Sequence, residues 1–373
     1  MKVRTTRVGL ALIGAALALP GSAVAATYQV SAGAPPTAKM PKSFAAGLYD
    51  ASSFYPSGHK TLQIRKGDKV TFSGGFHTAT ILGSSPRGAL EFLVPDPTGG
   101  TYAPVNDASL VPTPFYWAGK PKFVYNFATF LPAGSTAVNS STALYHSGVL
   151  FQYPKGYTLK FNKTGTYKLV CLLHPGMTGK IQVLARNKKV SSVAKVAKRA
   201  KAEVQADIRT ASTIDLNLPR SLQDPAVPVV TVGAGNRHTA LFAFYPQVLS
   251  VKTGTTVTFR SASVNEPHNV GIGELNYQFG LLQQVNLEPN GPTDPNQVNP
   301  FLFYGSDAPD AQGVRTFAGA ATHGNGYLAT PIVWKGAAPP ITAETKVKFT
   351  APGTYTYICQ IHPNMVGTLN VHP

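Results

Sequence analysis

The segment CLLHPGM, from Cys171 to Met177, returns near the C-terminus as CQIHPNM, from Cys359 to Met365, and the two copies contain both cysteines of the 373-residue chain. The similarity extends beyond this motif, because residues 161–183 align without gaps with residues 349–371 and ten of these 23 positions are identical. Upstream, LQIRKGDKVTF (62–72) matches LSVKTGTTVTF (249–259). Self-similarity of this extent indicates a repeated structural unit. The chain therefore encodes one module twice.

Each motif brings a thiol, an imidazole and a thioether into seven residues, in the spacing Cys-x2-His-x2-Met. One more histidine follows each matching upstream stretch: His77 in GGFHTATIL and His268 in NEPHNVGI. Sulfur ligands favour Cu(I), imidazole suits both oxidation states, and two histidines with one cysteine and a weak axial methionine form a blue, or type 1, copper site. Each module therefore contains four candidate copper ligands.

Both modules resemble the cupredoxins, the family of plastocyanin and azurin, and the short ligand loop is most similar to that of amicyanin. The resemblance covers the strand before each first histidine and the last 23 residues of each repeat. In that family a strand histidine and the Cys, His and Met of the loop before the last strand hold a single type 1 copper. The resemblance therefore implies two type 1 copper ions per chain. Their ligands would be His77, Cys171, His174 and Met177 in the first module, and His268, Cys359, His362 and Met365 in the second.

The resemblance also implies different surroundings for the two imidazoles of one site. The first histidine would be buried, and the loop histidine, His174 or His362, would reach the surface inside an apolar patch. Asn269 resembles the family asparagine that ties down the ligand loop, whereas the first module has Thr78 at this position. Because such bonds tune a metal site, we expect the two coppers to differ. The expected patch residues are Leu172, Leu173 and Pro175 in the first module, and Ile361 and Pro363 in the second.

Zinc and a disulfide are the competing interpretations of these residues. Methionine is a poor zinc ligand, and structural zinc sites prefer four Cys or His ligands. A disulfide would suit an exported protein, but the two cysteines occupy the same position of a repeated module and should lie in separate domains. The copper interpretation is therefore favoured.

Dense turn residues, with 35 glycines and 31 prolines, separate short stretches rich in Val, Thr, Tyr and Phe. This pattern predicts an all-β fold built of β-sandwiches. The resemblance implies two Greek-key cupredoxin domains, over residues 27–185 and 227–373. Each domain also carries a long insertion, at roughly residues 85–150 and 275–340, that the family does not explain.

A short basic linker, residues 186–226, joins the two domains. Within SSVAKVAKRAKAEVQADIRTAS, apolar residues recur at helical spacing, which predicts one amphipathic helix followed by a Pro-containing segment. We expect the apolar stripe to pack on a domain, and a free interaction helix is the alternative. The stripe consists of Val193, Val196, Ala200, Val204 and Ile208.

The chain begins with three basic residues, an apolar run from Val8 to Leu19 and the small-residue site Ala23-Val24-Ala25. These features predict a signal peptide over residues 1–25. The apolar run is shorter than the roughly 20 residues that span a bilayer. We therefore expect an exported protein without a transmembrane anchor, either secreted, periplasmic or associated with the cell envelope.

Charge is distributed unevenly along the chain. Residues 27–185 contain 14 lysines and arginines against 5 acidic residues, residues 186–226 contain 9 against 4, and residues 227–373 contain 7 against 7. A basic first half suits an acidic redox partner protein or an anionic cell envelope. Nucleic acid is disfavoured as a partner because no binding motif accompanies the charge.

Several features disfavour an oxidase. Multicopper oxidases, which resemble tandem cupredoxins, place a histidine directly before the blue-copper cysteine and use His-x-His motifs, but here Val170 and Ile358 precede the cysteines and no His-x-His occurs. An interdomain copper, as in a two-domain nitrite reductase, would need three further histidines, with His146, His238 and His323 as candidates. We expect all the remaining histidines to be surface or structural residues: His59, His146, His238, His323 and His372.

The sequence thus predicts a two-domain blue copper protein that transfers single electrons and is not an enzyme. The alternatives are a copper-binding protein for sequestration or delivery and, less favoured, a copper oxidoreductase with an additional interdomain copper.

Overall fold

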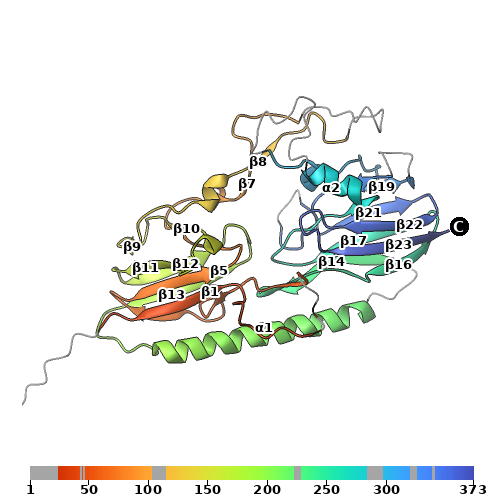
Figure 1. The fold of residues 1–373 in the computed structure, drawn as a ribbon. Helices are drawn as coiled ribbons and strands as arrows, with labels where there is room; N and C mark the ends of the chain where they lie inside the picture. The colour runs from red at the N-terminus through yellow and green to blue at the C-terminus, as the bar shows by residue number, and fades with distance from the viewer. Residues whose placement is uncertain are drawn as a thin grey trace, which may run out of the picture.

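The structure, a computed structural model, describes residues 24–42, 44, 47–102, 115–221, 228–283, 297–319, 326–337 and 341–373. Two β-sandwiches lie side by side, and one long helix, α1 (Val193–Ser221), runs beneath both of them (Figure 1). The expected all-β fold is confirmed, with three α-helices among the described residues. The expected signal peptide lies almost wholly outside the described residues, which begin at Val24.

The first sandwich consists of two five-stranded sheets. Their inward side chains alternate with outward ones, as in β13, where Gly179, Ile181 and Val183 are buried between more exposed neighbours. One sheet has the order β3 (Phe54–Tyr55), β1 (Thr27–Ala32), β5 (Lys69–Gly74), β11 (Tyr157–Phe161), β9 (Ala137–Val138). The other has the order β10 (Tyr145–Val149), β6 (Thr78–Ile81), β12 (Gly165–Val170), β13 (Thr178–Leu184), β4 (Leu62–Arg65).

The second sandwich repeats this arrangement. The strands β14, β17 and β21 adjoin one another as β1, β5 and β11 do, and in both domains the first pair of the three is parallel. One sheet has the order β19 (Val314–Phe317), β21 (Glu344–Phe349), β17 (Thr256–Ala262), β14 (Val229–Asn236), β15 (Thr239–Tyr245), β2 (Tyr49–Asp50). The other has the order β16 (Val248–Lys252), β23 (Val366–His372), β22 (Gly353–Ile358), β18 (Gly271–Ile272), β20 (Leu328–Ala329).

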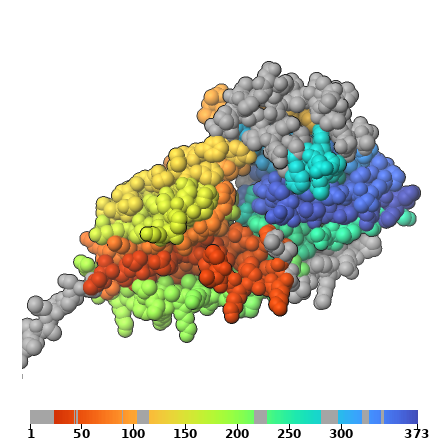
Figure 2. All heavy atoms as spheres, viewed as in Figure 1, coloured from red at the N-terminus to blue at the C-terminus, as the bar shows by residue number. Residues whose placement is uncertain are grey.

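One strand crosses from the N-terminal region to the second domain. In β2, Tyr49 pairs with Leu241 and Asp50 pairs with Ala240 of β15. Residues 49–50 therefore extend a sheet of the second sandwich, although they fall in the range expected for the first domain. Figure 2 shows the two domains in contact, with N-terminal residues reaching toward the second domain.

The helix α1 is longer than predicted. It continues to Ser221, through residues for which the sequence predicted a Pro-containing linker. Its apolar stripe packs on both domains. Val196 joins the core of the first domain, Ile208 packs with Tyr55, and Ala211 packs on the second domain. The alternative of a free interaction helix is wrong, because apolar residues of α1 between Val196 and Ile214 pack on the two domains, although Val193, the first residue of the predicted stripe, is exposed. None of the described helices has the length and apolar content needed to span a membrane.

The two insertions pack on one another on the side opposite α1 (Figure 1). Val124 and Gln297 form an isolated β-bridge, and the rings of Phe123 and Phe303 stack at 3.9 Å between centroids. This packing supplies a second connection between the domains. The insertions also contain the remaining short elements: η1 (Arg87–Leu90), β7 (Leu93–Pro95), β8 (Phe123–Tyr125), η2 (Phe127–Phe130), η3 (Leu150–Gln152), α2 (Leu275–Gln283) and α3 (Phe301–Tyr304).

Candidate metal centres

The first candidate metal centre lies at one end of the first sandwich. His77 immediately precedes β6, Cys171 immediately follows β12, and His174 lies on the loop before β13. The Cys171 Sγ lies 4.0 Å from His77 Nδ1 and 3.3 Å from His174 Nδ1, and the two Nδ1 atoms are 2.9 Å apart. Met177, at the end of the same loop, is fully buried in the core. The structure thus brings together the three expected N and S donors.

The second candidate centre repeats this geometry. Cys359 Sγ lies 3.7 Å from His268 Nδ1 and 3.6 Å from His362 Nδ1, and the two Nδ1 atoms are 3.2 Å apart. Met365 ends the loop and is buried. Donors bound at roughly 2.0–2.3 Å from a metal ion lie about 3–4 Å from one another, so both groups fit a single ion at their centre. Neither cysteine forms a disulfide.

Each ligand loop is closed by the same two backbone hydrogen bonds. The amide of Cys171 donates to the carbonyl of Met177 at 3.1 Å, and Met177 donates to the carbonyl of His174 at 3.0 Å. In the second domain Cys359 and Met365 form the corresponding bond at 3.0 Å. These bonds hold Cys, His and Met on one tight turn, which agrees with the spacing that the two repeats share.

A different side chain ties down each loop. In the second domain Asn269 Oδ1 accepts from the amide of Gln360 at 2.9 Å, and Asn269 Nδ2 donates to Gln360 Oε1 at 2.7 Å. In the first domain the Thr78 hydroxyl accepts from the amide of Leu172 at 2.9 Å, and the Thr78 amide points at Cys171 Sγ at 3.4 Å. Threonine therefore replaces one of the two asparagine bonds but not the other.

A glycine of the first sheet lies against each buried imidazole. Gly33 and Gly233 both have positive φ, 80° and 64°, and a Cβ at either position would collide with the Nε2 atom of His77 or His268. Positive φ and close approach are both conditions that glycine alone meets well. Neither glycine was predicted from the sequence. Gly33 directly follows β1, and Gly233 lies within β14, the corresponding strand of the second domain.

Two carboxylates distinguish the first centre from the second. Asp50 Oδ1 lies 3.7 Å from His77 Nε2, and Glu266 Oε1 lies 3.8 Å from His174 Nε2. Asp50 lies on β2, which joins a sheet of the second domain. Glu266 belongs to the second domain and precedes His268 by two residues. At the second centre His268 Nε2 has no hydrogen-bond partner, and Phe242 stacks on His362 at 4.3 Å. These carboxylates could not be predicted from the sequence, because their proximity to the histidines depends on how the domains pack.

The carboxylates reverse the effect of burial on the titratable groups of the first centre. Burial disfavours the charged imidazole, yet Asp50 raises the pKa of His77 to about 9 and Glu266 raises that of His174 to about 10. Burial alone would also raise the pKa of the Cys171 thiol, but the charges and hydrogen bonds of His174 and His77 hold it well below its ordinary value. Burial raises the pKa of Glu266 to about 7.

Burial dominates at the second centre. It lowers the pKa of His362 to about 4, with a further contribution from the charge of His174, and it holds the pKa of His268 well below the ordinary value. It also raises the pKa of the Cys359 thiol to about 11. The metal-free first centre therefore favours an imidazolium–thiolate pair, and the second favours neutral groups.

The two centres face one cavity between the domains. This cavity has a volume of about 930 Å³, and its lining includes His77, His174 and His362. Apolar side chains, among them Leu173, Phe242 and Ile361, form much of the remaining wall. Each loop histidine therefore lies among apolar side chains, as the resemblance implied, but it faces the cavity between the domains. The expected patch residues Leu173, Ile361 and Pro363 line the interdomain cavity, while Leu172 is buried.

The other histidines have separate environments. His146 is fully buried, with Nδ1 2.8 Å from Thr80 Oγ1 and Nε2 3.0 Å from the carbonyl oxygen of Thr129, so both ring nitrogens are used. His146 therefore has the structural role that the sequence predicted. His372 is exposed at the end of β23, and His323 lies outside the described residues. His59 and His238 meet beneath the domain junction.

Comparison with known protein families and with curated proteins finds no match. Solved structures similar to the chain include a mutant of amicyanin in its Cu(I) form, which is 20% identical, covers 41% of this chain and 89% of the amicyanin chain, and has a TM-score of 0.21. They also include oxidised plastocyanin from Dryopteris crassirhizoma, which is 22% identical, covers 38% of this chain and 98% of its own, and has a TM-score of 0.19. The structural neighbours are thus cupredoxins, as the ligand motifs suggested.

Proposed function

We propose that the chain is an exported two-domain blue copper protein that transfers single electrons. Copper would be held by His77, Cys171, His174 and Met177 in the first domain, and by His268, Cys359, His362 and Met365 in the second. The observation that carries the proposal is the doubled donor group, in which one thiol sulfur and two imidazole nitrogens converge within 3–4 Å at matching places of two domains.

The protein's own residues would keep each site rigid. The closed ligand loops, the glycines behind the first histidines and the bonds from Thr78 and Asn269 fix the donor positions independently of the metal's oxidation state. A bound type 1 copper would accept and release one electron. Little rearrangement of a preformed site favours fast transfer.

The shared cavity supports electron exchange between the two coppers. His174 and His362 line the same cavity, so an electron that arrives at one loop histidine would have only this cavity to cross to reach the other. An acidic redox partner remains our expectation, because the first domain and α1 carry the excess of positive charge. The same charge would hold the exported protein near an anionic cell envelope.

Copper quantitation with electron paramagnetic resonance tests the proposed function. We expect two copper ions per chain, both with type 1 signals, and an intense blue colour in the oxidised protein. Cys171→Ser and Cys359→Ser should each remove one copper and leave the other, whereas the matched control His372→Ala should retain both. Zinc in place of copper, or loss of both coppers in one cysteine variant, would contradict the proposal.

A further inference from the structure

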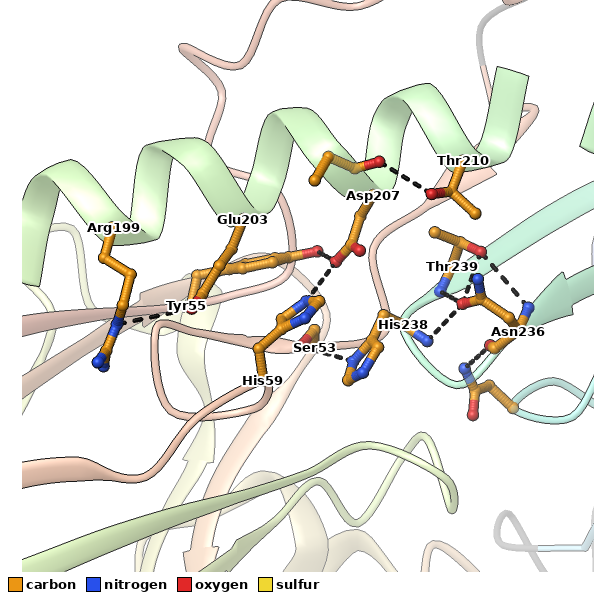
Figure 3. A network of polar contacts seen from close by, with 12 residues as sticks. Ser53, Tyr55, His59, Arg199, Glu203, Asp207, Thr210, Asn236, His238 and Thr239 are labelled. Atoms are coloured by element: carbon orange, nitrogen blue, oxygen red, sulfur yellow. Dashed lines mark hydrogen bonds and ion pairs between the residues drawn. The ribbon is translucent and has the colours of Figure 1, made fainter. Parts of the chain in front are cut away.

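A second type of polar cluster lies where the two domains meet α1, away from both cysteine centres. Figure 3 shows His59, Asp207 and His238 converging from three different parts of the chain. His59 lies on the loop between β3 and β4 of the first domain, and His238 lies on the turn between β14 and β15 of the second. Asp207 projects from α1 between them. The cluster therefore forms only when all three parts are assembled.

The distances within this cluster are short. His59 Nε2 lies 2.7 Å from Asp207 Oδ2, and the rings of His59 and His238 stack with 3.9 Å between their centroids. One donor atom from each of the three residues lies within 4.8 Å of the other two. Asp207 is buried, with 5% of its surface exposed, and His59 and His238 are more accessible. An ion could therefore reach the cluster from the histidine side.

Neighbouring groups orient these donors. The Tyr55 hydroxyl donates to Asp207 Oδ2 at 2.6 Å, and Ser53 Oγ lies 3.2 Å from His238 Nδ1, which leaves the Nε2 atom of His238 available. Bonds of this kind commonly fix the ring orientation of a ligating histidine. One turn earlier on α1, Glu203 Oε2 is buried and has no hydrogen-bond partner. This carboxylate oxygen is available to accept a hydrogen bond.

Two close imidazoles and a buried carboxylate are the donors of many zinc sites and of type 2 copper sites. Without an ion, the Asp207 carboxylate contacts only one of the two stacked rings directly. A divalent cation would satisfy all three side chains at once. Surface or structural roles were expected for His59 and His238, and His238 was also a candidate ligand for an interdomain copper together with His146 and His323. Nothing in the sequence showed that His59 and His238 meet.

We propose that His59, Asp207 and His238 bind one divalent transition-metal ion, with Zn²⁺ as the expected occupant. The ion would connect the first domain, α1 and the second domain. Its donors contain no sulfur and are separate from the eight expected type 1 copper ligands, so the proposal does not depend on the proposed function.

Isothermal titration of the purified full-length protein, already loaded with copper, with Zn²⁺ tests this site. The wild-type protein should bind one zinc ion. His59→Ala and His238→Ala should each weaken binding by at least about tenfold, because one of three ligands is lost. The control His372→Ala removes an exposed histidine outside the cluster and should bind zinc like the wild type. Retained blue absorbance and circular dichroism would show that the variants are folded.

A second readout follows the unfolding temperature. Zinc should raise it in the wild type and in His372→Ala but not in His59→Ala, because a ligand that binds only the folded state stabilises that state. Cu²⁺ added in place of Zn²⁺ should give a type 2 resonance signal that the same two histidine substitutions remove. Zinc uptake that is unchanged in both His59→Ala and His238→Ala, or no uptake by the folded wild type, would overturn the proposal.

Discussion

At the scale of single residues, Glu266 and Asp50 are the acidic side chains that distinguish the first centre from the second. Negative charge near a metal stabilises its more highly charged state, so these carboxylates favour Cu(II) at the first centre. At the second centre Phe242 and an unpartnered His268 Nε2 offer no such charge. The first copper should therefore have the lower reduction potential, and electrons should collect on the second.

We predict that Glu266→Gln raises the reduction potential of the first copper. One charge at about 7 Å, with an effective dielectric constant of about 20, corresponds to a shift on the order of 100 mV. Spectroelectrochemical titration of Cys359→Ser protein at about pH 8, above the pKa of Glu266 near 7, measures it. Wild-type and variant potentials should converge at lower pH, where the carboxylate is protonated. The control Glu344→Gln, at a surface ion pair with Arg260, should leave the potential unchanged.

Copper binding should release a proton at both centres, but from a different group in each. The metal-free first centre holds its proton on the His77–His174 pair, because the nearby carboxylates raise the pKa values of these imidazoles to about 9 and about 10, and their Nδ1 atoms, 2.9 Å apart, leave room for one proton between them. In the second centre the Cys359 thiol, with a pKa of about 11, must lose its proton, and the pKa of His362 is about 4. Affinity should therefore rise with pH at both centres.

The logarithm of copper affinity should rise by about one per pH unit at each centre between about pH 6 and 8. Chelator competition on Cys359→Ser isolates the first centre, and the same measurement on Cys171→Ser isolates the second. A copper affinity that does not change with pH in one of these variants would contradict the protonation state assigned to that centre.

At the scale of elements, α1 and β2 hold the two domains in register. The apolar face of α1 contacts both sandwiches, and β2 carries Asp50 from the N-terminal region onto the second domain's sheet. The helical stripe was predictable from its periodicity, because burial repeats every three to four residues. Its extent was not, since the part that packs on the second domain depends on tertiary contacts.

We predict that Ile208→Ala destabilises the protein by about 2–4 kcal/mol, since it removes a buried side chain from the contact between α1 and the first domain. Lys201→Ala, at an exposed position of the same helix, should change the free energy of unfolding by less than about 0.5 kcal/mol. Urea denaturation of the copper-free proteins compares the two variants. Similar midpoints would show that this face of α1 contributes little to stability.

The fold class and the convergence of one cysteine and two histidines in each domain were both predictable, for a shared reason. Each depends on a local pattern that occurs twice: Cys171-x2-His174-x2-Met177 and its repeat, and short strands between turns. Asp50, Glu266 and the His59–Asp207–His238 cluster were not predictable as sites. Their side chains meet only through the packing of one domain on the other, which leaves no periodic trace in the sequence.

At the scale of the whole molecule, the two domains turn their ligand loops toward each other. His174 and His362 line the same cavity, and α1 on one side and the packed insertions on the other connect the domains around it. The role of the insertions could not be predicted from the sequence. In the structure, residues of both insertions line part of the cavity between the centres. This arrangement differs from two independent carriers on a flexible tether.

We predict that electrons exchange between the two coppers within one molecule. After rapid reduction of a fraction of the copper, the two centres should equilibrate at a rate that does not depend on protein concentration. A mixture of Cys171→Ser and Cys359→Ser proteins is the matched control, because exchange there must occur between molecules and should quicken with concentration. A wild-type rate that rises in the same way would mean that the shared cavity does not connect the centres.

The continuous helix beneath both domains also affects how many electrons the protein could deliver in one encounter. A small carrier with one copper must meet its acceptor twice to complete a two-electron reduction, and the half-reduced acceptor must survive the interval. Here one helix of 29 residues keeps two candidate copper centres beside the same cavity. With copper bound and reduced at both centres, a single visit would deliver a pair of electrons, and duplication of the domain would change the kind of reaction that the protein can serve as well as its capacity.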